Sequence, residues 1–342
     1  MKPALLFICF ALFRVLLPAA AEQSTKTVVL PDLICPRYVN VDHQRFYIVE
    51  SRKRVTGYSV DDFKKNLEIN ARKGKGPGEY VNVPMVVPYG EHIIIKTTNK
   101  IAYYSRQGKY LHEKRLKRIG VIEPLGDGYL FWYFAYSKEE RSFFTVIEIQ
   151  DSNQQRLKKI YKYKAPKMNY IVSGGSRRGR FDLLRENLST VVCNNHIYIA
   201  DPSRGFFITV IDHKGRVIGE ISKNYPKTKI TTEDRKRLIE KAMYINGYTK
   251  QTWKRMRQAN DLHCPEFFPA FEKITVSDDR IYVKTYKSRD GKREFIILDL
   301  NGKEIKRVYL EDADMWAIRD STYYFISFSE DKDEWSLNRS GI

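Results

Sequence analysis

The sequence predicts an all-β fold, a six-bladed β-propeller with four antiparallel strands in each blade. Three observations favour this fold. Aromatic residues, which suit β-strands, are abundant, with 23 Tyr and 18 Phe among 342 residues. A pattern of short β-rich runs and polar turns recurs along almost the whole chain. The last copy of the pattern lacks one strand, and a β-like run near the N-terminus can supply it.

The second run of each repeat is its clearest marker, because it is apolar over the length of a strand and of the type x-Ile-Tyr-Ile. Its copies are RFYIVES (45–51), EHIIIKTT (91–98), YLFWYFAY (129–136), HIYIADP (196–202), RIYVKTY (280–286) and TYYFISFS (322–329). A first run precedes each marker, at 38–44, 81–90, 120–128, 189–195, 274–279 and 314–321. We expect these runs to be the first two strands of six blades.

The third and fourth runs form hairpins. The clearest copies turn on a glycine, which supplies the positive φ that tight turns need. They are residues 101–116 with Gly108, 208–222 with Gly215, and 295–310 with Gly302. Residues 57–71 and 145–163 are looser copies of the same hairpin.

The sixth repeat ends early, because only EWSLNRSGI (334–342) follows its marker. The run TKTVVLP (25–31) has no repeat of its own. A ring closes with fewer unpaired edges if this N-terminal strand completes the last blade. A β-sandwich with similar hairpins is the alternative, but a periodic repeat that consumes nearly the whole chain favours the ring.

Residues 1–21 are typical of a cleavable secretory signal peptide. Lys2 is a short basic region, Ala4–Leu12 is an apolar run, and Ala19-Ala20-Ala21 is a small-residue cleavage pattern. No second long apolar run follows, so we expect no transmembrane segment in the mature chain. The sequence therefore predicts a secreted or periplasmic protein.

Residues 22–342 are expected to form a single propeller domain with two insertions. The first insertion covers about 164–188, and the second covers about 223–272, between blades four and five. Function is concentrated in loops that a rigid scaffold carries, so the insertions are the first places to look for a site.

The segment GKGPGEY (74–80) lies between the outermost strand of the first blade and the first strand of the second. Its glycines permit backbone angles that other residues resist, its proline stiffens the link, and its glutamate can accept backbone N–H bonds. A phosphate cradle is the alternative, but such a cradle needs a following helix, and here a strand follows. We expect a structural role for Gly74, Gly76, Pro77, Gly78, Glu79 and Tyr80.

This segment resembles the G-x-G-P-G-E-[FY] link in six-bladed propellers of bacterial cell-envelope proteins, which are related in pattern to NHL-repeat and TolB-like propellers. The hairpins, the x-Ile-Tyr-Ile runs and PAFEKITVSDDRIYVKTY (269–286) resemble the same family. The resemblance covers about residues 25–342 and implies the propeller fold. It implies no single function, because such propellers include enzymes and binding modules.

The formal net charge is +19, and it becomes +17 when Lys2 and Arg14 leave with the signal peptide. Such a balance favours an anionic partner: an anionic glycan or other polymer, a nucleic acid, or an acidic protein. A solvated basic surface without a partner is the alternative.

The first insertion contains SGGSRRGRF (173–181), in which guanidinium groups can bind phosphate, sulfate or carboxylate. Its candidate ligand-binding residues are Arg177, Arg178 and Arg180. A solvated basic loop is the alternative.

The sequence of the second insertion predicts a helix capped by Thr231 or Thr232. We expect this helix to break at Gly247 and a second helix to follow around 249–259. Trp253 is a candidate binding residue, because a basic amphipathic helix suits a partner or a membrane surface; packing on its own domain is the alternative. We expect the loop arginines to share a basic face with Lys236, Arg237, Lys254, Arg255 and Arg257.

Three cysteines remain in the mature chain: Cys35, Cys193 and Cys264. Three thiols make no disulfide framework, but one pair is compatible with an oxidising compartment. If one pair forms, we expect it to be Cys193 with Cys264, because both lie near first strands of neighbouring blades.

The sequence therefore favours a non-catalytic binding or interaction module for an anionic glycan or an acidic partner, with no cofactor and no metal. The alternative is a propeller enzyme, a hydrolase, lactonase or lyase, with its site at the mouth of the central channel. Carboxylates that suit such a site are Glu123, Asp201 and Asp278.

Overall fold

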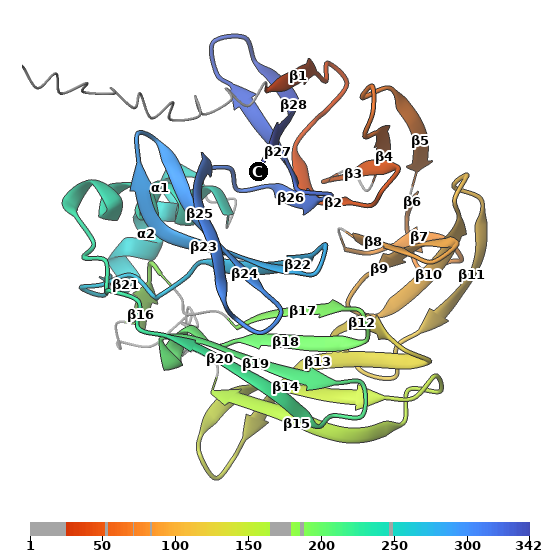
Figure 1. Cartoon of the computed structure of the whole chain (residues 1–342), viewed down its shortest axis with the longest axis horizontal. Helices are drawn as coiled ribbons and strands as arrows, with labels where there is room; N and C mark the ends of the chain where they lie inside the picture. The colour runs from red at the N-terminus through yellow and green to blue at the C-terminus, as the bar shows by residue number, and fades with distance from the viewer. Residues whose placement is uncertain are drawn as a thin grey trace, which may run out of the picture.

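The computed structural model is a six-bladed β-propeller, in which six four-stranded antiparallel sheets stand around a central axis (Figure 1). The structure describes residues 25–51, 54–70, 72–82, 84–164, 179–184, 188–245 and 249–342. The predicted fold is confirmed: the blades follow one another around the ring in chain order, and the first strand of each blade lies innermost.

The first three blades contain the predicted runs as strands. Blade one is β2 (Pro36–Val41), β3 (Arg45–Glu50), β4 (Arg54–Ser59) and β5 (Lys65–Asn70). Blade two is β8 (Met85–Tyr89), β9 (His92–Lys96), β10 (Lys100–Ser105) and β11 (Tyr110–Arg115). Blade three is β12 (Val121–Leu125), β13 (Gly128–Ser137), β14 (Ser142–Gln150) and β15 (Arg156–Lys164).

The other three blades have the same order. Blade four is β17 (Ser189–Cys193), β18 (His196–Ala200), β19 (Phe206–Asp212) and β20 (Val217–Lys223), with the short 3-10 helix η1 (Pro202–Arg204) between β18 and β19. Blade five is β22 (Lys273–Ser277), β23 (Arg280–Arg289), β24 (Lys292–Asp299) and β25 (Glu304–Glu311). Blade six is β26 (Trp316–Arg319), β27 (Thr322–Ser329), β28 (Glu334–Gly341) and β1 (Lys26–Val29).

The N-terminal strand closes the ring as predicted. β1 pairs antiparallel with β28, from Lys26 opposite Arg339 to Val29 opposite Ser336. The backbone N–H of Leu30 then donates to the carbonyl of Trp335 over 2.8 Å, and the Leu30 side chain is buried. The first and last strands of the chain therefore share one sheet.

Apolar clusters between neighbouring blades form the core. Each of the six blade junctions contains one, and Phe295 of blade five against Trp316 of blade six is typical, with ring centroids 5.1 Å apart. The hairpin glycines fit these junctions closely. Gly302 has a φ of 86°, and a Cβ at this position would lie 2.6 Å from the Ile221 side chain of blade four. Both the turn conformation and the blade contact therefore require glycine there.

The order of strands gives the propeller two different faces. One face, the turn face, contains the turns between first and second strands and between third and fourth strands. The opposite face, the link face, contains the links from one blade to the next. Both insertions and the GKGPGEY segment are such links, so their described residues belong to the link face.

Candidate functional site

The two insertions meet and build one module beside blades four and five (Figure 1). β16 (Gly179–Asp182), from the first insertion, pairs in parallel with β21 (Asn260–His263), from the second. Helices α1 (Thr232–Ile245) and α2 (Lys250–Ala259) complete it, so the predicted helical insertion between blades four and five is confirmed. Their shared apolar cluster is Phe181, Leu183, Ala242, Trp253 and Met256.

The candidate ligand residues of the insertions take different places in this module. Trp253 is only 6% exposed, and its ring packs edge-on against Phe181 at 5.8 Å, so it contributes to the interior of the module. Arg180 lies in β16, and the structure does not describe its side chain. Arg177 and Arg178 lie outside the described residues. A ligand site at these arginines therefore remains a prediction.

A reciprocal cap fixes the start of α1. The Thr231 hydroxyl accepts the backbone N–H of Asp234 at 3.1 Å, and the Asp234 carboxylate accepts the backbone N–H of Thr231 at 3.0 Å. These bonds satisfy free N–H groups at the helix start, so Thr231 is the predicted cap.

The GKGPGEY segment connects blades one and two and forms a compact turn. The Glu79 carboxylate accepts the backbone N–H of Gly76 at 2.9 Å, and a Cβ on Gly74 would lie 2.0 Å from the same carboxylate. Tyr80 is fully buried, and its hydroxyl lies 3.0 Å from that of Tyr104. The Glu79 carboxylate therefore bonds within the turn of its own segment.

A buried ion pair fixes this segment to blade two. Lys100 donates to the carbonyl of Gly76 at 2.9 Å and to the Glu113 carboxylate at 2.8 Å. Glu113 also accepts the backbone N–H of Gly78 at 3.1 Å, and the Lys100 ammonium lies 5.0 Å from the centroid of the Tyr80 ring. The polar groups of the motif are thus paired with blade two.

A cleft of about 950 Å³ opens on the link face between α1, the link after β25 and blade six. Aromatic side chains of blade six, Phe325, Phe328 and Trp335, form part of its wall. A second cleft of about 390 Å³ follows α1 to Phe268 and Tyr286. The two clefts share part of their lining, and we refer to them together as the α1 groove; the shared residues are Lys241, Glu272, Asp312 and Asp314.

Ion pairs hold the shared wall of the α1 groove. Lys241 of α1 lies 2.6 Å from Asp314 and 3.5 Å from Glu272, and Lys284, which is 1% exposed, lies 2.9 Å from Asp312. Arg293 also pairs with Asp312. These contacts join the insertion to blade five and to the link that enters blade six.

The pKa values in this wall follow from those pairs. Burial alone would raise the pKa of Asp312, but Arg293 and Lys284 outweigh burial and lower it to about 2. Burial alone would lower the pKa of Lys241, but Glu272 and Asp314 outweigh that effect and raise it. Both groups are therefore held in their charged forms at neutral pH.

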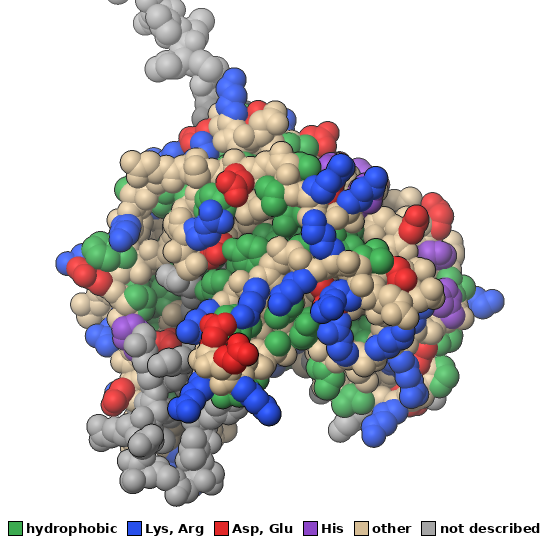
Figure 2. Space-filling view, turned by 90° about the horizontal axis from the view of Figure 1, so that it is seen from below, with side chains coloured by type: hydrophobic (Ala, Val, Ile, Leu, Met, Phe, Trp, Pro, Cys, Tyr) green, Lys and Arg blue, Asp and Glu red, His purple; other side chains and the backbone are tan. Residues whose placement is uncertain are grey.

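A basic surface extends over the outer edges of blades two, three and four. Figure 2 views the edge on which β15 lies, and Lys and Arg side chains gather across it. Cross-blade hydrogen bonds bring its parts together: Gln154 donates to the carbonyl of Arg115 at 2.8 Å, and Lys158 donates to that of Gly215 at 2.7 Å. Its exposed members are Arg115, Lys117, Arg156, Lys158, Lys159 and Lys214.

The sequence predicts a basic face on the insertions, whereas this surface on the blades was not predicted. A signal for it was present, since RLKKIYKYK (156–164) has five cations and no carboxylate. The exposed cations of the helices, such as Lys236 and Lys254, form a second group on the module.

The carboxylates considered for an enzyme lie in three separate places. Glu123 in β12 pairs with the buried Lys96. Asp201 caps η1, where it accepts the backbone N–H of Ser203 at 3.0 Å and the Tyr161 hydroxyl at 2.6 Å. Asp278 lies on the turn face, where it accepts the backbone N–H of Ser321 at 3.2 Å. Each of them has a local structural partner, and the structure does not bring the three together.

A ring of polar contacts, which we call the turn ring, connects all six blades on the turn face. At each junction a turn residue meets a residue of the next blade. The pairs are Asp42 with Arg106, Tyr89 with Gly126, Gly126 with Asn195, Asn194 with Asp279, Asp278 with Ser321, and Asp320 with His43.

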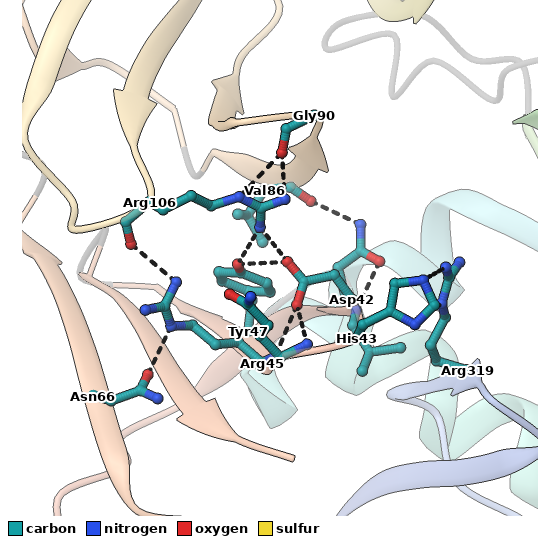
Figure 3. A network of polar contacts seen from close by, with 12 residues as sticks. Asp42, His43, Arg45, Tyr47, Asn66, Val86, Gly90, Arg106 and Arg319 are labelled. Atoms are coloured by element: carbon teal, nitrogen blue, oxygen red, sulfur yellow. Dashed lines mark hydrogen bonds and ion pairs between the residues drawn. The ribbon is translucent and has the colours of Figure 1, made fainter. Parts of the chain in front are cut away.

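Figure 3 shows the junction of blades one and two in this ring. Arg106 of blade two reaches the Asp42 carboxylate and the Tyr47 hydroxyl of blade one, and it donates to the carbonyl of Gly90 at 3.1 Å. Burial alone would raise the pKa of Asp42, but backbone N–H groups, Tyr47 and Arg106 hold it below its ordinary value. This cluster stabilises the junction.

All three mature cysteines are free thiols, so the predicted pairing of Cys193 with Cys264 is wrong. Cys193 ends β17 on the turn face and packs against the cluster between blades four and five. Cys264 follows β21 and packs against the cluster of the insertion module on the link face. The prediction failed because the second insertion moves Cys264 away from the first strand of blade five.

The described part of the chain contains no group of three or more His, Cys, Asp and Glu residues that could hold a metal ion. Among the described helices, none is long and apolar enough to cross a membrane.

No family model matches the sequence, and no curated protein matches it. Among solved structures, a chain of the "Crystal Structure of Mitotic Checkpoint Complex" is 8% identical, with a TM-score of 0.47, over 100% of this chain and 99% of that chain. BamB from Moraxella catarrhalis is 12% identical, with a TM-score of 0.36, over 89% of this chain and 84% of its own. Likenesses this distant show no family, and the resemblance to NHL-repeat and TolB-like propellers remains a prediction.

Proposed function

We propose that this chain is an exported, non-catalytic binding module that holds an anionic polymer, such as an acidic glycan, on its basic surface. The contiguity of that surface carries the proposal. Three blades contribute to it, and hydrogen bonds from Gln154 and Lys158 fix the relative positions of their edges. Fixed, neighbouring cations suit a polymer, because each contact adds to the counterions released on binding.

The side chains of the basic surface are open to a ligand, although Lys158 also donates to the Gly215 carbonyl. All six members are exposed, and no salt bridge joins any of them to a carboxylate of the described residues. The nearby acidic groups are already engaged: Glu148 pairs with Arg118, and Asp212 pairs with Arg216 at 2.7 Å. The surface therefore presents uncompensated positive charge.

Export rests on the sequence of residues 1–21, with its basic start, apolar run and small-residue cleavage pattern. A secreted or periplasmic location would place the basic surface among envelope and extracellular polymers, many of which are anionic. The binding role and the location therefore support each other.

A different role for the same cations is protection of the sheet. Lysines on outer strands prevent edge-to-edge pairing, and β15 is an outer strand. Both roles predict a basic edge, but only the binding role predicts affinity that depends on these particular positions.

The test is retention of the mature chain on a heparin column in a salt gradient. The variant is Lys117→Ser, Arg156→Ser, Lys159→Ser. The control removes three exposed cations from blades five and six: Lys303→Ser, Lys306→Ser, Lys332→Ser. We expect the variant to elute at clearly lower salt than the control. The slope of log affinity against log salt should fall by on the order of one for each cation that no longer meets an anionic group of the polymer.

A third protein, with Arg177→Ser, Arg178→Ser and Arg180→Ser, tests the prediction made from the sequence. Weaker retention of this protein alone would move the anion site to the first insertion. Equal elution of the parent, the variant and the control would overturn the proposal and leave the charge as a solubility feature.

A further inference from the structure

We propose that the α1 groove binds an extended basic segment of a partner protein, in which Lys or Arg lies between apolar side chains. This site is separate from the basic surface and takes a ligand of opposite charge. It therefore does not depend on the proposed function.

Carboxylates outnumber cations among the residues that line the larger cleft, although the whole chain is basic. The larger cleft is lined by two cations, Arg37 and Lys241, and by the carboxylates Glu272, Glu311, Asp312, Asp314 and Asp333. On a chain with a net charge of +19, a cationic ligand is repelled by most of the surface and attracted here.

The cations of the shared wall do not pair with all of these carboxylates. Glu272, Asp312 and Asp314 are opposed by Lys241, Lys284 and Arg293. Glu311 has Lys292 at 3.7 Å on an exposed strand edge, and Asp333 forms no ion pair with a residue that the structure describes. Asp333 therefore remains to face a ligand cation, and Glu311 can be shared between Lys292 and the ligand.

Aromatic pairs lie toward both ends of the groove. Phe328, which is 43% exposed, packs near Trp335 with centroids 4.8 Å apart. Toward the other end, Phe268 stacks on Tyr286 at 4.5 Å. Apolar side chains of a ligand can bury area on such rings, and a cation can lie over a ring face.

The shape of the groove favours an extended segment over a compact cation. Both clefts are lined by α1 and by the same four charged residues, which therefore lie between the part with Phe328 and Trp335 and the part with Phe268 and Tyr286. The Thr231 cap and the ion pairs of Lys241 hold the wall in place before binding. A preformed groove loses less entropy on binding than a flexible one.

The test is isothermal titration of the mature chain with an acetylated, amidated peptide of sequence Leu-Lys-Arg-Leu at low salt. The reference probes are Leu-Glu-Glu-Leu, Gly-Lys-Arg-Gly and spermidine. We expect Leu-Lys-Arg-Leu to bind most tightly and Leu-Glu-Glu-Leu to bind least.

Two double variants separate the groove from general charge. Glu311→Gln with Asp333→Asn removes the two available carboxylates, and we expect affinity for Leu-Lys-Arg-Leu to fall about 5- to 10-fold, as for two partly exposed ion pairs. Glu330→Gln with Asp331→Asn removes the same amount of charge. Both residues lie on the turn that contains Asp333, but neither lines the groove. We expect this control to change affinity less than about 2-fold, in the range of screened surface charges.

A third variant tests the apolar part of the claim. Phe328→Ser should weaken Leu-Lys-Arg-Leu about 5-fold and leave Gly-Lys-Arg-Gly unchanged, because only the first peptide has apolar side chains to bury. Unfolding of each variant is followed in parallel, so a folding defect is recognised as such.

Four results would overturn the proposal: no heat with Leu-Lys-Arg-Leu at millimolar concentration, equal binding of the acidic peptide, equal weakening in the control variant, or binding of spermidine as tight as that of the peptide.

Discussion

The turn face and the link face differ in what their polar side chains contact. On the turn face, polar groups bond from blade to blade around the ring, as Asp278 does with Ser321. On the link face, polar groups hold an inserted module and also line a groove in which Asp333 forms no ion pair with a described residue and Glu311 pairs with Lys292 at 3.7 Å. A carboxylate is therefore a better functional candidate on the link face. The sequence alone does not assign the enzyme candidates Glu123, Asp201 and Asp278 to either face.

The largest expected effect tests the ring on which both faces depend. Deletion of residues 22–31 removes β1 and the buried Leu30 from blade six. The edge of β28 then becomes unpaired, and we expect the melting temperature to fall by about 10 °C or more, or the protein to aggregate. Thermal unfolding followed by circular dichroism measures the change in melting temperature. A truncated chain that melts like the mature chain would refute closure by β1.

The second prediction concerns the GKGPGEY segment, which belongs to the link face and whose polar groups are paired with blade two. Glu113→Gln leaves Lys100 buried without its counter-charge, which costs about 3 to 5 kcal/mol of unfolding free energy. The control is Lys100→Met with Glu113→Gln, which removes both charges and should recover part of the loss. Urea unfolding measures both. Equal stability of the single and double variants would show that the pair is not what holds this link.

The third prediction uses the pH dependence of the wall of the α1 groove. Asp312 has a pKa of about 2 in the folded chain, below its ordinary value of 3.8. Its ion pairs therefore stabilise the fold above about pH 3.8, and this contribution is lost as the pH falls toward 2. Asp312→Asn lacks that contribution. When the pH is lowered from about 4.5 to 2.5, both proteins lose stability, but the unfolding free energy of the variant should decrease by about 1 to 2 kcal/mol less than that of the parent. Parallel pH curves of the two proteins would contradict the role of Arg293 and Lys284.

The blades could be predicted from the sequence because their signals are local. Apolar runs of strand length and glycine turns such as Gly302 mark each strand and each turn within a few residues. The closing strand could also be predicted, because a repeat with a missing strand leaves only one place for TKTVVLP (25–31).

The sites could not be predicted in the same way, because they depend on contacts between distant segments. The α1 groove exists only where Lys241 of α1 meets Asp314 in the link that enters blade six and Glu272 before blade five. The parallel pairing of β16 with β21 has no local pattern that specifies it. The charge of β15 was visible in the sequence, but the contacts of Gln154 with Arg115 and of Lys158 with Gly215 were not.

The smallest expected effect separates the two faces most directly. Asp278 has a φ of 53° and holds the backbone N–H of Ser321. Asp278→Asn keeps an acceptor and a residue that tolerates this φ, so the change in unfolding free energy should be under about 0.5 kcal/mol. Asp278→Ala loses the hydrogen-bond acceptor and the tolerance of this φ. We expect it to lower the unfolding free energy by about 1 kcal/mol and the melting temperature by about 2 to 4 °C. Neither variant should change affinity for Leu-Lys-Arg-Leu, since Asp278 lies on the face opposite the α1 groove. If Asp278→Asn instead weakened that binding while stability stayed the same, the turn face would take part in recognition, and the division between the two faces would fail.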